Sequence, residues 1–179
     1  MRYRPKRGTP DGPPGPWVLL AAWGPCGFSP VAPGTVGTLG AIPLFWLLRD
    51  LPLWLYLVTL AGFTALAVAA AGEAGRYWKV ADASPIVIDE VAGYLLAMAF
   101  FPWSWEGALV GFALFRVFDV LKPWPASALD RVKSGLGVVA DDLAAGAWAA
   151  MAYAFLSLAL RLALGCGGGL HFWCAELTP

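Results

Sequence analysis

A run of about twenty uncharged residues, Leu51 to Ala71, limits the folds open to this chain more than any other feature. The hydrocarbon core of a bilayer takes about twenty apolar residues of helix to cross, so this length fits a membrane span. The composition agrees, because 59% of the 179 residues are hydrophobic and only 13% are charged. The mean hydropathy of +0.66 is far from that of an average soluble domain. We therefore expect a membrane protein.

Four more apolar runs predict helices at about 34–48, 86–101, 105–121 and 138–164. We expect an all-α membrane helical bundle of about five helices, with short interfacial helices such as the amphipathic stretch 126–133. The run at 34–48 contains Pro43 and is short for a span, which leaves open whether it crosses the bilayer fully. The formal net charge of zero does not indicate nucleic acid as a partner.

The chain is long enough for one domain of ordinary size. We expect a basic, proline-rich tail and interfacial segment at residues 1–23, a membrane-embedded domain at 24–164 and a C-terminal tail at 165–179. The roles of three residues in that last tail are left open, namely Cys166, His171 and Cys174.

Two adjacent acids, Asp89 and Glu90, lie in an otherwise apolar stretch. Acids are costly in such surroundings unless they bind a cation or a basic partner. Ser84 and Pro85 predict the start of their helix, as N-cap and first helical residue, which would place both acids in its first two turns. Gly93 shares a face with both acids and leaves room for a ligand or another helix. For the two acids alone, a buried ion pair that only fixes helix packing is the alternative interpretation.

Three other polar clusters fall at predicted helix ends. The loop 27–38, rich in glycine, proline and hydroxyl groups, opens onto the first helix, where free N–H groups favour an anion. The fourth helix finishes with Arg116, Asp119 and Lys122, whose spacing of three puts them along one face. The last helix begins with the acid pair 141–142, followed by a small-residue face that allows close helix contact. If the helices alternate across the bilayer, all four clusters lie on one side.

The basic residues predict which side this is. With a cytoplasmic N-terminus, ten of the twelve lysines and arginines fall on or near the cytoplasmic side, and only Arg49 and Arg161 lie toward the other. Cytoplasmic loops carry such an excess of positive charge. We therefore expect a multi-pass membrane protein with its site on the cytoplasmic side.

The residue types at this site suggest a reaction. Carboxylates without cysteine or histidine suit a hard cation such as Mg²⁺, and Arg116 and Lys122 suit phosphate oxygens. A metal held in this way can activate water for phosphoryl hydrolysis, here of a phospholipid headgroup. The predicted metal ligands, which with Lys122 form the predicted catalytic set, are Asp89, Glu90, Asp119, Asp141 and Asp142. The predicted phosphate-binding residues are Thr35, Thr38, Arg116 and Lys122.

Four motifs together closely resemble the phosphatidylglycerophosphatase A family, over roughly residues 24–150. They are GFSPVAPGTVGT (27–38), DASPIVIDEVAG (82–93), FRVFDVLKPWP (115–125) and GLGVVADDLAAG (135–146). The resemblance implies a Mg²⁺-dependent membrane phosphatase that converts phosphatidylglycerophosphate to phosphatidylglycerol. The sequence departs from the family pattern at Ala83, where proline often follows the aspartate, and at Tyr94, where glutamine is frequent.

Two alternatives belong to other classes. A non-enzymatic membrane protein could bind or conduct a divalent cation through the acidic cluster, but an ion path would need acids distributed through the membrane depth. A phosphatidyltransferase would show spaced aspartates after an Asp-Gly start, a pattern that we do not find.

Overall fold

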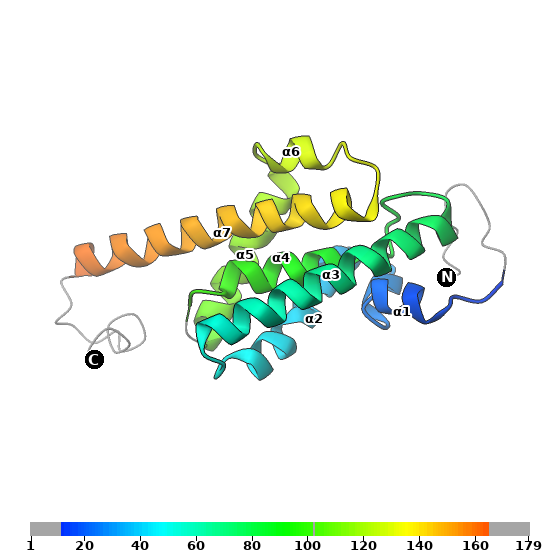
Figure 1. Cartoon of the computed structure of the whole chain (residues 1–179). Coiled ribbons are helices and arrows are strands. Elements are labelled where there is room, and N and C mark those ends of the chain that lie inside the picture. The colour runs from blue at the N-terminus through cyan, green and yellow to red at the C-terminus, as the bar shows by residue number, and fades with distance from the viewer. Residues whose placement is uncertain (1–11, 102, 165–179) are drawn as a thin grey trace.

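The computed structural model describes residues 12–101 and 103–164, and this part of the chain is all-helical (Figure 1). The prediction of an all-α bundle is therefore confirmed. The five predicted helices correspond to α2, α3, α4, α5 and α7, and two shorter helices and a 3-10 turn lie beside them. The elements are α1 (Pro16–Ala21), a 3-10 turn (Cys26–Phe28), α2 (Pro33–Leu48), α3 (Leu53–Trp78), α4 (Ile88–Met98), α5 (Trp105–Leu121), α6 (Ala126–Leu129) and α7 (Gly135–Leu164).

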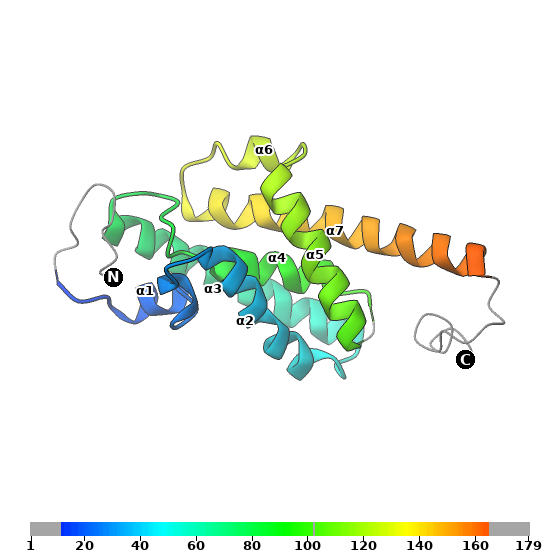
Figure 2. The same ribbon diagram turned by 180° about the vertical axis from the view of Figure 1, so that it is seen from behind.

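Helix α4 is the centre of the bundle. It packs against α2, α3, α5 and α7, with α3 and α7 on one side of it and α2 and α5 on the other (Figures 1 and 2). Nine of its eleven residues are buried. Eleven helical residues are about 16 Å long, whereas the hydrocarbon core is about 30 Å thick. The predicted helix 86–101 is thus a short buried helix whose length does not span a bilayer.

Among the described residues, two helices are long and apolar enough to cross a membrane. They are α3 and the part of α7 from Gly135 to Ala159, with mean hydropathies of 2.0 and 1.3. Helix α3 continues to Trp78, beyond the predicted end at Ala71, because Ala74 and Trp78 are buried on its inner face while Arg76 is exposed. The apolar helix α2 has 16 residues and falls short of this length.

The predicted start of α4 at Ser84 and Pro85 is wrong. Helix α4 begins at Ile88, with Val87 in the N-cap position. The main-chain N–H of Val87 donates to the carbonyl oxygen of Ala21 at 2.9 Å, and the side chain of Val87 is fully buried. This segment is therefore held against the end of α1 instead of starting the helix. The acids at 89 and 90 still lie in the first turn, as predicted. The predicted amphipathic helix 126–133 is also shorter, because α6 ends at Leu129.

Helices α4 and α7 approach closely at two glycines. A Cβ atom on Gly93 would lie 2.6 Å from the carbonyl oxygen of Asp142, and one on Gly146 would overlap the carbonyl oxygen of Gly93. Small residues at a crossing allow such an approach. This contact places the beginning of α7 beside the first turn of α4, where the predicted site lies.

Candidate metal and phosphate site

The four predicted polar clusters line one cavity of about 290 Å³ at one end of the bundle. Its walls come from the first turn of α2, the first turn of α4, the end of α5, the segment containing α6 and the beginning of α7. All but one of the predicted site residues line it, namely Thr35, Asp89, Glu90, Arg116, Asp119, Lys122, Asp141 and Asp142. Residues separated by more than a hundred positions therefore share one site.

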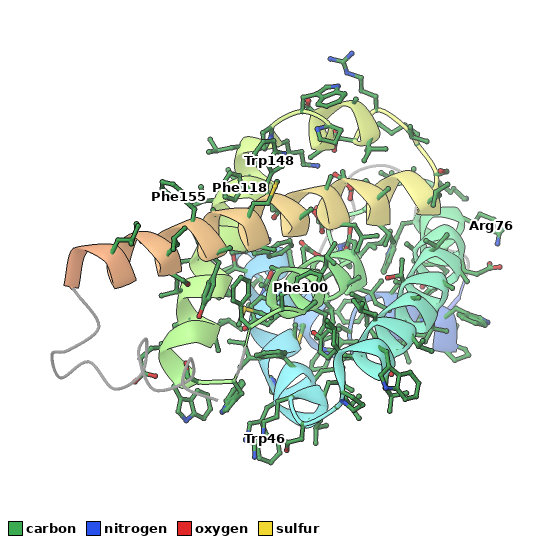
Figure 3. The ribbon with its side chains drawn as sticks, turned by 60° about the vertical axis from the view of Figure 1, so that its left-hand side comes forward. Trp46, Arg76, Phe100, Phe118, Trp148 and Phe155 are labelled. Atoms are coloured by element: carbon green, nitrogen blue, oxygen red, sulfur yellow. The ribbon has the colours of Figure 1, made fainter. Side chains whose placement is uncertain are left out.

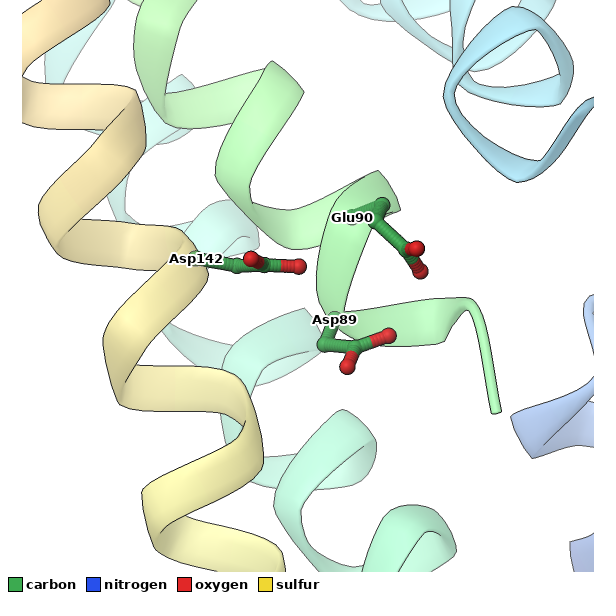
Figure 4. A group of neighbouring side chains, drawn as sticks. All are labelled: Asp89, Glu90 and Asp142. Atoms are coloured by element: carbon green, nitrogen blue, oxygen red, sulfur yellow. The ribbon is translucent and has the colours of Figure 1, made fainter. Parts of the chain in front are cut away.

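Three of the five acids, Asp89, Glu90 and Asp142, form a compact group (Figure 4). Each offers a carboxylate oxygen, and these oxygens all lie within 4.8 Å of one another. Oδ1 of Asp89 and Oε2 of Glu90 are buried without a hydrogen-bond partner. Buried acceptors without partners are costly, and clustered carboxylate oxygens are the ligands that hard cations prefer. These three residues therefore fit a metal ion such as Mg²⁺.

Burial raises the pKa of both acids on α4. The pKa of Asp89 is raised first by burial and then by the negative charge of Glu90. Burial, with a further contribution from the charge of Asp142, raises the pKa of Glu90 to about 8. Burial disfavours the ionised form of a carboxyl group, and a bound cation reverses this effect. The ion-free site therefore favours protonated acids, and a cation would stabilise their charged forms.

Asp119 lies beside this group, next to Arg116. Nη1 of Arg116 is 2.5 Å from Oδ2 of Asp119 and 3.8 Å from Oε1 of Glu90. Neither contact has hydrogen-bond geometry, so this buried Nη1 has no hydrogen-bond partner. The guanidinium group is therefore attracted to both acids while its N–H bonds stay available to the oxygens of a ligand.

Asp141 points to a different partner, Lys122. Nζ of Lys122 donates to Oδ2 of Asp141 at 2.5 Å and also to Oδ1 of Asp130. Burial lowers the pKa of Lys122, but the two hydrogen bonds outweigh it and raise the pKa overall. The hydrogen bond from Lys122 lowers the pKa of Asp130. The five predicted metal ligands thus divide into the compact group of three, an acid beside Arg116, and one held by Lys122.

The first turn of α2 reaches this site at Gly34. A Cβ atom there would overlap Oε1 of Glu90 and lie 3.3 Å from Nη1 of Arg116, so a larger residue would displace both. Thr35 lines the cavity, but Thr38 does not. Thr38 is fully buried, and its hydroxyl donates to the carbonyl oxygen of Gly34 at 2.9 Å. Its hydroxyl is therefore used within α2.

The sequence prediction left out two acids that line the cavity, Asp82 and Asp130. Asp82 belongs to the motif at 82–93, in which the following residue, Ala83, departs from the family pattern. Asp130 lies in the predicted amphipathic stretch 126–133. Its partner Lys122 is eight residues away across two prolines, and no local pattern predicts that pairing.

A sequence profile and individual relatives both match this chain to the family that its four motifs resemble. The sequence profile described as phosphatidylglycerophosphatase A matches residues 19–157. The chain is 40% identical to phosphatidylglycerophosphatase A of Escherichia coli, covering 73% of this chain and 77% of that protein. It is 36% identical to phosphatidylglycerophosphatase A of Haemophilus influenzae, covering 75% and 84%.

A third relative comes from Bacteroides thetaiotaomicron, and its description names phosphatidylinositol-3-phosphatase as its candidate activity. It is 35% identical, over 80% of this chain and 91% of its own length. No solved structure gave a significant match.

Proposed function

This chain belongs to the phosphatidylglycerophosphatase A family of phosphatases, and we propose that it hydrolyses phosphatidylglycerophosphate to phosphatidylglycerol and inorganic phosphate, with Mg²⁺ as cofactor. The observation that carries this proposal is the compact group of three acids in one cavity with Arg116 and Lys122. Carboxylates without cysteine or histidine favour Mg²⁺ over softer metals. Positive side chains beside them favour a phosphate group as the ligand.

We assign the metal ligands to Asp89, Glu90 and Asp142, with Asp119 and Asp141 completing the acidic set around them. When bound there, Mg²⁺ would offset the charge of the phosphate group and lower the pKa of a water molecule. The hydrolysis forms a bond from water oxygen to phosphorus, breaks the bond from phosphorus to the glycerol oxygen, and transfers a proton from water to that oxygen.

The chain's own residues would bind and orient the phosphate group. Nη1 of Arg116 forms ion pairs with Asp119 and Glu90 but no hydrogen bond, so it can donate to phosphate oxygens. Its charge stabilises the phosphate more strongly where water is excluded. The beginning of α2 at Thr35 adds a hydroxyl and the positive end of a helix dipole. The ammonium group of Lys122, fixed between two acids, would lie beside the phosphate as a second positive charge.

We also propose how the enzyme lies in the membrane. The two long apolar helices support a membrane protein, and the basic residues near the site support a cytoplasmic position of the cavity, by the excess of positive charge on that side. This would place the site in the headgroup layer of a bacterial-type plasma membrane. We propose residues 24–164 as the catalytic domain, since all the acids and bases of the site fall within that range.

The test measures inorganic phosphate released by the purified full chain in mixed lipid vesicles. We expect release from phosphatidylglycerophosphate, loss of release with EDTA, and recovery with Mg²⁺. Phosphatidylinositol 3-phosphate should be included as a second substrate, because one relative is described by that activity. Metal binding without phosphate release from any lipid monophosphate would overturn the proposal and favour the non-enzymatic cation-binding alternative.

A further inference from the structure

A second cavity, of about 370 Å³, lies between the end of α3 and the beginning of α7. Its floor is small and apolar, with Ala71, Gly72 and Gly75 on α3. Its other lining includes three basic residues, Arg76, Lys79 and Lys133. Figure 3 shows Arg76 projecting outward near the end of α3, close to the beginning of α7. Lys133 also lines the cavity with the acids, so the two cavities are neighbours at the same end of the bundle.

The walls of this second cavity are held by backbone contact. A Cβ atom on Gly135, the first residue of α7, would lie 2.5 Å from the carbonyl oxygen of Val68 and 2.6 Å from the main-chain nitrogen of Gly72. Ser134 precedes α7 and accepts a hydrogen bond from the N–H of Gly137 at 3.2 Å. The beginning of α7 is therefore fixed on α3 by backbone contact, while the three basic side chains line the cavity between the two helices.

The charge of the cavity favours an anion. None of the described residues that line it is an acid. Nζ of Lys133 donates to the carbonyl oxygen of Asp130 at 2.8 Å, and its positive charge also helps to lower the pKa of the partly exposed Asp130 carboxyl group. Arg76 pairs with Glu73, but both side chains are largely exposed, and such pairs exchange readily with other partners. The positive end of the α7 dipole adds to this field.

Apolar surface surrounds the basic residues. Val80, Val132 and Leu136 are 38%, 47% and 62% exposed, beside the ends of the two helices that are long enough to cross a membrane. A basic cavity between such helices at the headgroup level suits an anionic lipid. The basic residues contact its charged headgroup, and the exposed apolar side chains contact its apolar part. A free anion would use the charges and leave the apolar surface in water.

We propose that this second cavity binds an anionic phospholipid, whose headgroup phosphate lies against Arg76, Lys79 and Lys133 and whose glycerol backbone lies over Gly72 and Gly75. This lipid is additional to the substrate in the cavity with the acids. The proposal depends on the position of the protein in a membrane and does not depend on which lipid phosphate is hydrolysed.

The experiment measures lipid retained by the purified full chain in detergent, by native mass spectrometry. The probe is phosphatidylserine, which is anionic but carries no phosphate monoester, and zwitterionic phosphatidylcholine is the comparison. We expect clear preference for phosphatidylserine. The double variant Arg76→Gln and Lys79→Gln should bind it roughly 25-fold more weakly, about fivefold for each positive charge near a headgroup. The single variant Arg49→Gln is the control, because Arg49 follows the end of α2 that lies away from the cavity with the acids. It should bind phosphatidylserine as the unchanged protein does.

Several results would overturn the proposal. These are equal retention of the two lipids by the unchanged protein, full retention of phosphatidylserine by the double variant, or its displacement by excess inorganic phosphate, which would indicate a site for the free anion. Phosphate release by the double variant serves as the check on folding and should be unchanged. The variant Arg76→Lys with Lys79→Arg keeps both charges and should keep the lipid. If the enzyme released no phosphate from any lipid, the retention measurement would still decide this proposal.

Discussion

The main chain of Gly93 on α4 touches the Cα position of Gly146 on α7, so closely that a Cβ atom on Gly146 would overlap the Gly93 carbonyl oxygen. This contact holds the two helices that carry the compact group of three acids, two of them on α4 and Asp142 on α7. The geometry of the site therefore depends on the absence of a side chain several residues away from it.

The first prediction concerns this contact. Gly146→Ala should lower the free energy of unfolding by about 1 to 3 kcal/mol, as overpacking does in well-packed cores, and should also weaken metal binding by moving Asp142 from its partners. Thermal unfolding in detergent and metal titration measure the two effects. Gly62→Ala is the matched control, because its Cβ would meet nothing within 4 Å, and alanine there should be neutral or slightly stabilising. Unchanged stability of both variants would contradict the close contact.

The second prediction concerns the compact group of acids. Asp89→Asn keeps the size of the side chain but removes its charge, so phosphate release should fall at least about 100-fold while the helical content is kept. Calorimetric titration with Mg²⁺ should show weaker binding in the same variant. Asp50→Asn changes an exposed acid at the opposite end of α2 and should leave both measurements as they are. Normal turnover by Asp89→Asn would remove this residue from the metal site.

The third prediction concerns pH. The pKa of Glu90 in the ion-free protein is about 8, so below that pH a cation must displace a proton to bind its carboxylate. The apparent affinity for Mg²⁺ should therefore rise with pH, about tenfold per unit for one proton, and level off above about pH 8. Titrations in buffers of different ionisation enthalpy count the protons released. An affinity that is flat between about pH 6 and pH 8 would contradict the raised pKa.

The fourth prediction concerns Asp130. Its pKa is lowered in the folded protein and that of Lys122 is raised. The pair therefore stabilises the fold above the unfolded pKa of the acid, near 4, and below that of the lysine, near 10. Asp130→Asn should lower the free energy of unfolding by less than about 1 kcal/mol at neutral pH, because the pair is partly exposed.

The difference between Asp130→Asn and the unchanged protein should shrink as pH falls through the lowered pKa of Asp130, and thermal unfolding measured from about pH 3 to pH 8 follows it. Glu73→Gln breaks a pair that is more exposed and should change stability less at every pH. A difference that grows toward acid pH would mean that the sign of the Asp130 shift is wrong.

Much of the site could be predicted because acids in apolar surroundings are expensive. That cost is why Asp89 and Glu90 could be singled out from the sequence, and why the acid pair at the beginning of α7 could be placed with them. Their burial against one another in the structure follows the same physics. The order of the helices along the chain was enough to predict that the four polar clusters at helix ends lie on one side.

The remaining features depend on contacts between distant segments. The start of α4 was predicted from Ser84 and Pro85, but the hydrogen bond from Val87 to Ala21 decides it, and no local pattern encodes that pairing. The uncharged run predicted the end of its helix at Ala71, whereas the buried Ala74 and Trp78 on the inner face of α3 continue the helix. In both places packing outweighs the local signal.

The shortness of α4 also bears on how the protein is made. Helix α4 has only eleven residues and carries two acids in its first turn. It is therefore unfavourable in lipid without its neighbouring helices. Its neighbours are α2 and α3, which precede it, and α5 and α7, which follow it along the chain. A nascent chain on the ribosome thus has no complete acid group until Asp142 on α7 has been translated, and phosphatase activity should arise only after α7 has packed against α4.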